Sequence, residues 1–166
     1  MNSALFERRA SQQTIAGTVR VAAGHWEKGQ GSDVLYTREI GACIGVAIYD
    51  TAARIGHMAH VYSTEGSQLA VIGGVVDSIR LNSTDSSSLI GWVSGGSSEA
   101  KMPDWLDPDV LLRSKAIARL GQLGLDPMMK NLQVDWNNDE RLLVGMSLNC
   151  ATGDYVPTKS HNADGA

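Results

Sequence analysis

The sequence predicts a single domain with more strand than helix, and three observations support this fold class. With 166 residues, of which 43% are hydrophobic, the chain is long enough to bury one core and short for two. Its 18 glycines favour tight turns between strands over a helical bundle. Short apolar segments alternate with turn residues, one segment has helical periodicity, and another has the residues that begin and end a helix. We therefore expect one domain over residues 17–157, with flexible termini at 1–16 and 158–166.

The predicted strands are short apolar or alternating segments bounded by glycine or polar turns. Two of them, Cys43–Tyr49 and Gly56–Tyr62, flank a turn at Asp50–Ile55 and predict a hairpin. Lys28–Asp33 is expected to be a loop, because it lacks apolar residues. The other strands are expected at Thr18–Ala22, Val34–Thr37, Ser88–Val93, Leu132–Trp136 and Leu142–Leu148, and the chain then turns towards Tyr155 and Val156.

Two segments are expected to be helices, each from a different sequence signal. Over residues 66–81 the apolar side chains recur every three or four positions. A second helix is expected over residues 108–123, because Asp107 is a favoured cap and Pro108 is favoured in the first turn. Gly124 is the residue type that commonly ends a helix.

Charge and hydropathy argue against several classes of function. The formal net charge of −4 and a sequence pI near 5.5 give no broad basic surface for nucleic acid or an anionic membrane. The longest apolar runs, Ile40–Tyr49 and Leu69–Val76, are far shorter than the roughly 20 residues that span a bilayer. The polar N-terminus does not have the pattern of a secretory signal. We therefore expect a cytoplasmic protein that neither binds nucleic acid nor inserts into a membrane.

The cysteines are expected to be free thiols, since two are few for a disulfide framework in a reducing compartment. Cys150 follows a predicted strand and is expected to be structural. The histidines His25, His57 and His161 have no compact metal-ligand spacing with either cysteine, so we expect no metal and no cofactor.

Cys43 and His60 are the candidate catalytic pair, because the hairpin can bring them to one face of the sheet. If Tyr49 pairs with Gly56, then Gly45 lies opposite His60 and Cys43 is a diagonal neighbour of the imidazole. Gly45, without a side chain, would leave room for the ring. By the same register His57 points to the opposite face.

These residue types fit nucleophilic catalysis. A thiol with an ordinary pKa of about 8.5 needs a base beside it, which His60 can provide, and the Thr37 hydroxyl can orient the ring. Backbone N–H groups near Gly41 and Ala42 could stabilise an oxyanion. Gly95 and Gly96 are expected to allow close backbone packing near the site. The alternative is a small buried cysteine and a hydrogen-bonded structural histidine.

The stretch from Thr37 to Asp50, followed by Gly56 to His60, resembles the CheD family of bacterial chemoreceptor glutamine deamidases. The family signature runs roughly T-x-G-L-G-S-C-V-A-V-x-x-Y-D and then G-x-x-A-H, and Thr37, Cys43 and His60 match its threonine, nucleophile and general base in spacing. The resemblance extends over about residues 19–156.

That resemblance implies an α/β fold with mixed β-sheets packed centrally like a sandwich and flanking helices, in α/β/β/α layers. It implies that Cys43 attacks a glutamine carboxamide, that His60 protonates the departing ammonia, and that water hydrolyses the thioester. Backbone groups at Gly41, Ala42, Gly95 and Gly96 would bind substrate or oxyanion. The implied substrate is the cytoplasmic helices of chemoreceptors, and a CheC-type phosphatase is a possible partner.

The chain departs from the family at several positions, which leaves other functions open. Glu39 replaces a signature glycine, Ala42 a serine, and Asn137 and Asn138 a glycine pair. The same Cys–His arrangement also resembles deamidating toxins of the cytotoxic necrotizing factor type. A deamidase effector acting on another cell, or a non-catalytic CheD-like regulator, are the alternatives to a receptor deamidase.

Overall fold

The computed structural model describes residues 17–62, 69–83, 85–96, 108–137 and 142–161. In this part of the chain, nine strands form two mixed sheets with the orders β1-β3-β8-β9 and β2-β5-β4-β6-β7. The pairs β1–β3 and β6–β7 are parallel, and the other pairs are antiparallel. The strands are β1 (Thr18–Arg20), β2 (His25–Gln30), β3 (Val34–Ile40), β4 (Ile44–Asp50), β5 (Ile55–Val61), β6 (Leu89–Gly95), β7 (Leu132–Trp136), β8 (Leu142–Asn149) and β9 (Tyr155–His161).

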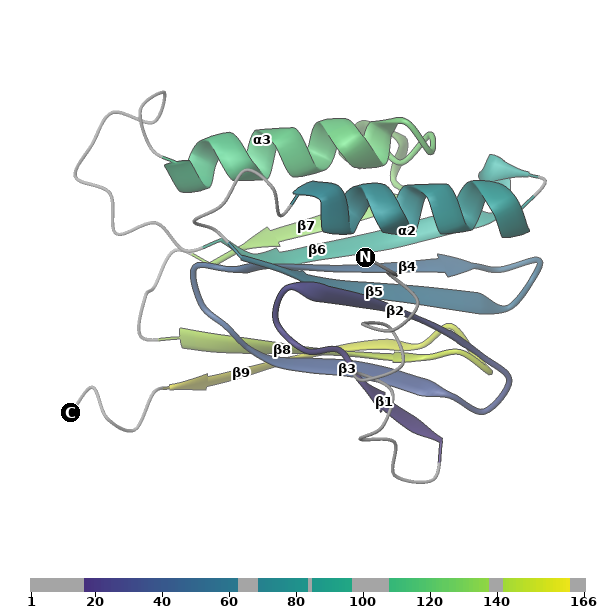
Figure 1. Ribbon diagram of the computed structural model, residues 1–166, viewed down its shortest axis with the longest axis horizontal. Coiled ribbons are helices and arrows are strands. Elements are labelled where there is room, and N and C mark those ends of the chain that lie inside the picture. Colours follow the sequence, from purple (N-terminus) through teal and green to yellow (C-terminus); the bar gives the residue numbers. More distant parts are fainter. Residues whose placement is uncertain (1–16, 63–68, 84, 97–107, 138–141, 162–166) are drawn as a thin grey trace, which may run out of the picture.

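The helices lie together on one side of the molecule. Helices α2 (Leu69–Asn82) and α3 (Pro108–Gly121) cover one face of the five-stranded sheet, and the four-stranded sheet packs on its other face (Figure 1). The short helices η3 (Ser86–Ser88) and η4 (Pro127–Met129) lie in connections. None of the helices in the described ranges has the length and apolar character needed to cross a bilayer.

The expected α/β fold with two mixed sheets is confirmed, whereas the α/β/β/α layering is wrong for the described residues, which form α/β/β layers (Figure 1). The outer face of the four-stranded sheet carries polar side chains and needs no helix over it. Arg38, for example, is exposed there and lies over the ring of Tyr36 at 5.6 Å, while Leu35 and Thr37 alternate towards the interior.

Strand β4 is buried on both faces and positions the candidate site. Ile44, Val46 and Ile48 pack towards the helices in one apolar cluster. Ala47 and Tyr49 pack towards the four-stranded sheet in a second cluster. Because both faces are covered, the strand is a continuous apolar run and not an alternating one.

Two predicted boundaries differ from the structure. The first half of the segment expected to be a loop, Lys28–Asp33, lies within β2, an edge strand whose polar side chains conceal the strand pattern. Strand β9 continues to His161, so residues 158–161, expected in the flexible terminus, pair with β8. The predicted hairpin and the two helices are found close to their expected positions. Residues 1–16, 162–166 and Asp107 lie outside the described residues.

Candidate functional site

The predicted hairpin register is confirmed, and it places Cys43 and His60 on the same face of the five-stranded sheet. Tyr49 pairs with Gly56, and Gly45 pairs with His60. Cys43 precedes β4 by one residue and packs against the apolar cluster between the two sheets. His60 faces that same space and is 4% exposed, whereas Cys43 is half-buried. The thiol and the imidazole are therefore diagonal neighbours.

Thr37 holds the His60 ring through a hydrogen bond between the sheets. The Thr37 hydroxyl donates to the Val21 carbonyl oxygen at 2.8 Å. The Thr37 hydroxyl oxygen also lies 2.8 Å from His60 Nδ1. A hydroxyl has one hydrogen, which the carbonyl already accepts, so the Thr37 oxygen must accept a proton from Nδ1–H. The neutral ring is therefore the Nδ1–H tautomer, with a lone pair on Nε2.

A β-bulge beside Thr37 shapes the approach to the ring. The pairing of β3 with β8 shifts between Thr37, opposite Met146, and Ile40, opposite Val144. Within the bulge Glu39 has φ of 61°, a left-handed conformation that is strained for a side chain larger than glycine. A bulge of this kind re-aims side chains next to it, and here it brings the Glu39 carboxylate within electrostatic range of His60.

Burial keeps the His60 imidazole neutral. Loss of hydration lowers the pKa of His60 to about 4; the Glu39 carboxylate opposes this shift, and the Arg20 cation adds to it. Nε2 is shut off from solvent and forms no hydrogen bond with any described residue, including the Cys43 sulfur. A buried acceptor without a hydrogen bond costs about 1–3 kcal/mol and needs an explanation.

Glycines bring the end of β6 against Cys43. Gly95 has φ of 95°, and a Cβ atom there would lie 2.3 Å from the Cys43 carbonyl oxygen, so a larger residue would displace it. The N–H of Gly96 donates to that same oxygen at 2.7 Å. The expectation of close backbone packing by these two glycines is confirmed. Gly41 is half-buried and Ala42 exposed in the bend before Cys43, and their oxyanion role stays a prediction.

The role expected for Gly45 is wrong in detail. A Cβ atom on Gly45 would lie 2.3 Å from Met146 Sδ and 2.4 Å from Ile40 Cδ1. The space over this glycine is therefore filled by two apolar side chains of the opposite sheet and not by the imidazole. Gly45 is required for the close packing of the two sheets beside His60.

Two polar groups that the sequence did not single out also lie near Cys43. Ser94 pairs with Gly45 on the face that carries His60; it is 1% exposed and its hydroxyl oxygen has no hydrogen bond. Arg113 of α3 packs against Gly96, and its buried Nε likewise has none. Strand alternation could have identified Ser94. The position of Arg113 depends on how α3 packs on the sheet, and no local sequence pattern predicts it.

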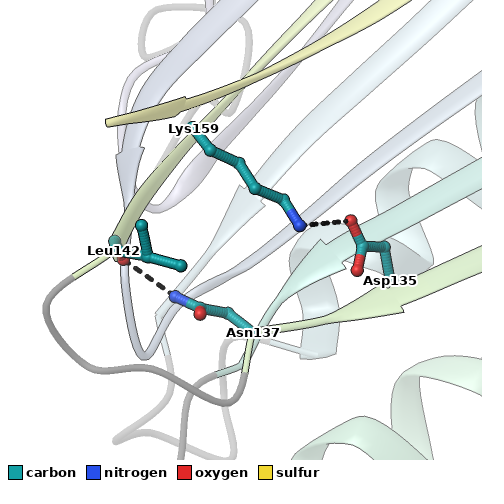
Figure 2. A network of polar contacts seen from close by, with 4 residues as sticks. All are labelled: Asp135, Asn137, Leu142 and Lys159. Atoms are coloured by element: carbon teal, nitrogen blue, oxygen red, sulfur yellow. Dashed lines mark hydrogen bonds and ion pairs between the residues drawn. The ribbon is translucent and has the colours of Figure 1, made fainter. Parts of the chain in front are cut away.

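Polar contacts join the two sheets at this end of the molecule. Figure 2 shows Asn137 Nδ2 donating to the Leu142 carbonyl oxygen at 2.8 Å, and Lys159 of β9 reaching Asp135 of β7 at 3.2 Å. The backbone N–H of Asn137 also donates to the Gly95 carbonyl oxygen at 2.8 Å. Asn137, which replaces a glycine of the CheD signature, therefore ties the end of β7 to both β6 and β8.

The other histidines and Cys150 differ from the candidate pair. His25 in β2 lies directly opposite His60, a neighbour missed because β2 was not predicted. In the described part of the chain, no group of three or more His, Cys, Asp or Glu residues could hold a metal ion. Cys150 is fully buried, and burial raises the pKa of its thiol to about 11. It is structural, as expected, and lies against Gly29 and Gly56 at the other end of β5.

No protein-family model and no curated protein matches the sequence. Similar solved structures include the hypothetical protein YfiH of Bacillus licheniformis, with 13% identity and a TM-score of 0.50, where the match covers 68% of this chain and 50% of that one. Another is Neisseria meningitidis protein NMB0706, described as DUF152, with 13% identity and a TM-score of 0.46, covering 70% and 54% of the two chains. The chain spans about half the length of these proteins, and at this identity the YfiH likeness establishes a fold alone.

The prediction of a divergent CheD-family member is wrong, because the fold that the chain shares with solved structures is that of YfiH and no family model matches the sequence. The function expected from that resemblance, glutamine deamidation in chemotaxis with its effector and regulator alternatives, is wrong for the same reason. The positions of Thr37, Cys43 and His60 do not depend on the resemblance.

Proposed function

We propose that this chain is a cysteine-dependent hydrolase in which Cys43 is the nucleophile, His60 the general base and Thr37 the residue that orients His60. The sulfur attacks the carbonyl carbon of an ester or amide as His60 Nε2 takes the thiol proton. The imidazolium returns that proton to the leaving group when the carbon–heteroatom bond breaks. Water, deprotonated by the same nitrogen, then hydrolyses the thioester and regenerates the thiol.

One observation carries this proposal: the hydrogen bond from His60 Nδ1–H to Thr37, which leaves the Nε2 lone pair without a partner on the face that carries Cys43. A purely structural histidine would use both ring nitrogens or expose one to water. Here Nδ1 is fixed by Thr37, and Nε2 is buried and unprotonated, because burial lowers the pKa of His60 to about 4. A neutral imidazole is the form that can accept a proton from the thiol.

The polar groups near Cys43 support a site for a ligand. His60 Nε2 is an acceptor, Arg113 Nε is a donor, and the Ser94 hydroxyl can act as either. All three are buried without a hydrogen bond, and a bound carbonyl compound offers the complementary acceptor and donor atoms. Native proteins leave few buried polar groups unsatisfied, so two on the Cys43 face of the sheet, and a third on the arginine that contacts Gly96, favour a binding function over packing alone.

The test is hydrolysis of p-nitrophenyl acetate by the wild type, Cys43→Ser and Cys150→Ser. We expect release of p-nitrophenolate by the wild type and Cys150→Ser, and a fall of about a thousandfold or more in kcat/KM for Cys43→Ser. Intact-protein mass spectrometry after rapid acid quench should find one acetyl group, on the Cys43 peptide. Equal rates for wild type and Cys43→Ser, or an acetyl group on another residue, would refute the nucleophile.

A further inference from the structure

Arg113 brings a guanidinium group to the backbone that supports Cys43. A Cβ atom on Gly96 would lie 2.9 Å from Arg113 Nε, and the Gly96 N–H donates to the Cys43 carbonyl oxygen at 2.7 Å. Gly96 is therefore in contact with both residues.

The described residues satisfy little of the hydrogen-bonding capacity of Arg113. A guanidinium has five N–H donors. Nη2 donates to the Asn137 carbonyl oxygen over a long 3.3 Å, and the buried Nε donates to nothing. The Trp136 ring lies 5.0 Å from the guanidinium carbon and attracts its charge, but it does not replace in-plane acceptors. No carboxylate of the described residues forms an ion pair with Arg113.

The buried Nε donor calls for an acceptor. Arg113 is half-buried, but its Nε is shut off from solvent and has no hydrogen bond to a described residue, which costs about 1–3 kcal/mol. If Arg113 served only to brace Trp136 and Asn137, an uncharged side chain of similar length would provide the packing without this cost. The planar fork of arginine is instead suited to binding a carboxylate or phosphate through two parallel hydrogen bonds.

We propose that Arg113 is a specificity-determining residue that binds an oxyanion, a carboxylate or a phosphate, carried by the substrate whose carbonyl group reacts with Cys43. The substrate class is therefore an anionic acyl compound. The assignment to a substrate rests on the proposed hydrolase function, whereas the anion site beside Cys43 can be measured without it.

The experiment compares alkylation of Cys43 by iodoacetate and iodoacetamide, followed by peptide mass spectrometry. The two reagents are nearly equal in size and both lose iodide to the sulfur, but only iodoacetate is an anion. A change in the reactivity of the thiol alters both rates by the same factor. The ratio of the two rates therefore reports only the effect of the negative charge on the reagent. We expect this ratio to be about tenfold or more lower in Arg113→Gln than in the wild type, with Arg113→Lys between them.

Arg119→Gln is the matched control, because Arg119 is an exposed arginine of the same helix; its removal should leave the ratio unchanged. An unchanged iodoacetamide rate in Arg113→Gln shows that the variant folds and keeps the thiol accessible. In the wild type, acetate or inorganic phosphate, added separately, should slow iodoacetate, and the stronger competitor identifies the anion.

Equal ratios in the wild type and Arg113→Gln, no protection by either anion, or a wild-type Cys43 inert to both reagents would each overturn the anion site. Failure of the hydrolase function gives a different pattern. In that case ester hydrolysis survives in Cys43→Ser while the alkylation ratio still depends on Arg113.

Discussion

His57 and His60 lie three residues apart on β5 and have the same ionisation but opposite surroundings. Burial is the main cause that lowers the pKa of each to about 4. His57 faces the helices, where Nε2 is 2.9 Å from the Ser78 hydroxyl and the ring stacks on Trp26. His60 faces the other sheet, where Thr37 fixes Nδ1 and Nε2 has no hydrogen bond.

Burial and a shifted pKa therefore do not distinguish a structural histidine from a reactive one. Both rings are neutral and both are held in place. What differs is that His60 has a ring nitrogen buried without a hydrogen bond, and that this nitrogen lies on the face of the sheet that carries Cys43. By that criterion His57 stabilises the helix layer, and His60 has a lone pair available beside Cys43.

The largest expected effect comes from replacing the two histidines in turn. His60→Asn should lower kcat/KM for p-nitrophenyl acetate by about a hundred- to ten-thousandfold, because the thiol loses its base. His57→Asn should retain activity within a fewfold and instead lower the urea midpoint, because it removes the contacts with Ser78 and Trp26. Similar losses of activity in the two variants would show that His57 and His60 do not differ in function.

Thr37→Val sharpens the comparison, because it removes the hydroxyl and keeps the shape. We expect kcat to fall roughly ten- to a hundredfold as the ring loses its fixed tautomer. The free energy of unfolding should fall by about 1–3 kcal/mol, since the Val21 carbonyl oxygen and His60 Nδ1–H lose their partner. Thr37→Ser should restore both quantities. If Thr37→Val kept the kcat of the wild type and lost only stability, the hydrogen bond between Thr37 and His60 would be purely structural.

Acid should weaken the fold and the activity over a defined range. Both rings are neutral when folded, but in the unfolded chain they bind protons below pH about 6.5. The folded-state pKa is the lower one, so stability is complete above pH 6.5 and falls as the pH decreases through 4, by at most about 3 kcal/mol per histidine. Unfolding in urea across this range measures the loss, and His60→Asn should reduce it.

For kcat/KM, the acidic limb should lie near pH 4, because His60 acts as a base when neutral. An acidic limb near 6.5 would show that the ring is hydrated and not buried in the active form.

The smallest effect is expected at the bulge. Glu39→Gly relieves the left-handed strain and should change the free energy of unfolding by less than about 1 kcal/mol. It also removes the carboxylate that raises the pKa of His60, so that pKa should fall further. Glu39→Gln separates the two effects, because it removes the charge and keeps the strain. An unchanged His60 titration in both variants would exclude electrostatic coupling across the bulge.

Local pattern predicted the hairpin that carries the candidate pair. The apolar strand, the turn after Tyr49 and the period-two alternation fix which of His57 and His60 shares a face with Cys43. The sheet order, the placement of both helices on one face, and the contact of Arg113 with Gly96 depend on packing between distant segments. Edge strand β2 was missed because half-exposed polar residues carry no apolar periodicity. The family resemblance was misleading because short motifs around a hairpin do not determine a function.

The most direct test of the His60 assignment is nitrogen-15 NMR of the histidine rings at neutral pH, before and after alkylation of Cys43 with iodoacetamide. We predict that His60 has a protonated Nδ1 and an unprotonated Nε2, and that alkylation shifts the His60 resonances while those of His57 stay in place. A proton on His60 Nε2 in the unmodified protein, or His60 resonances that do not respond to modification of Cys43, would contradict the proposed pairing of base and nucleophile.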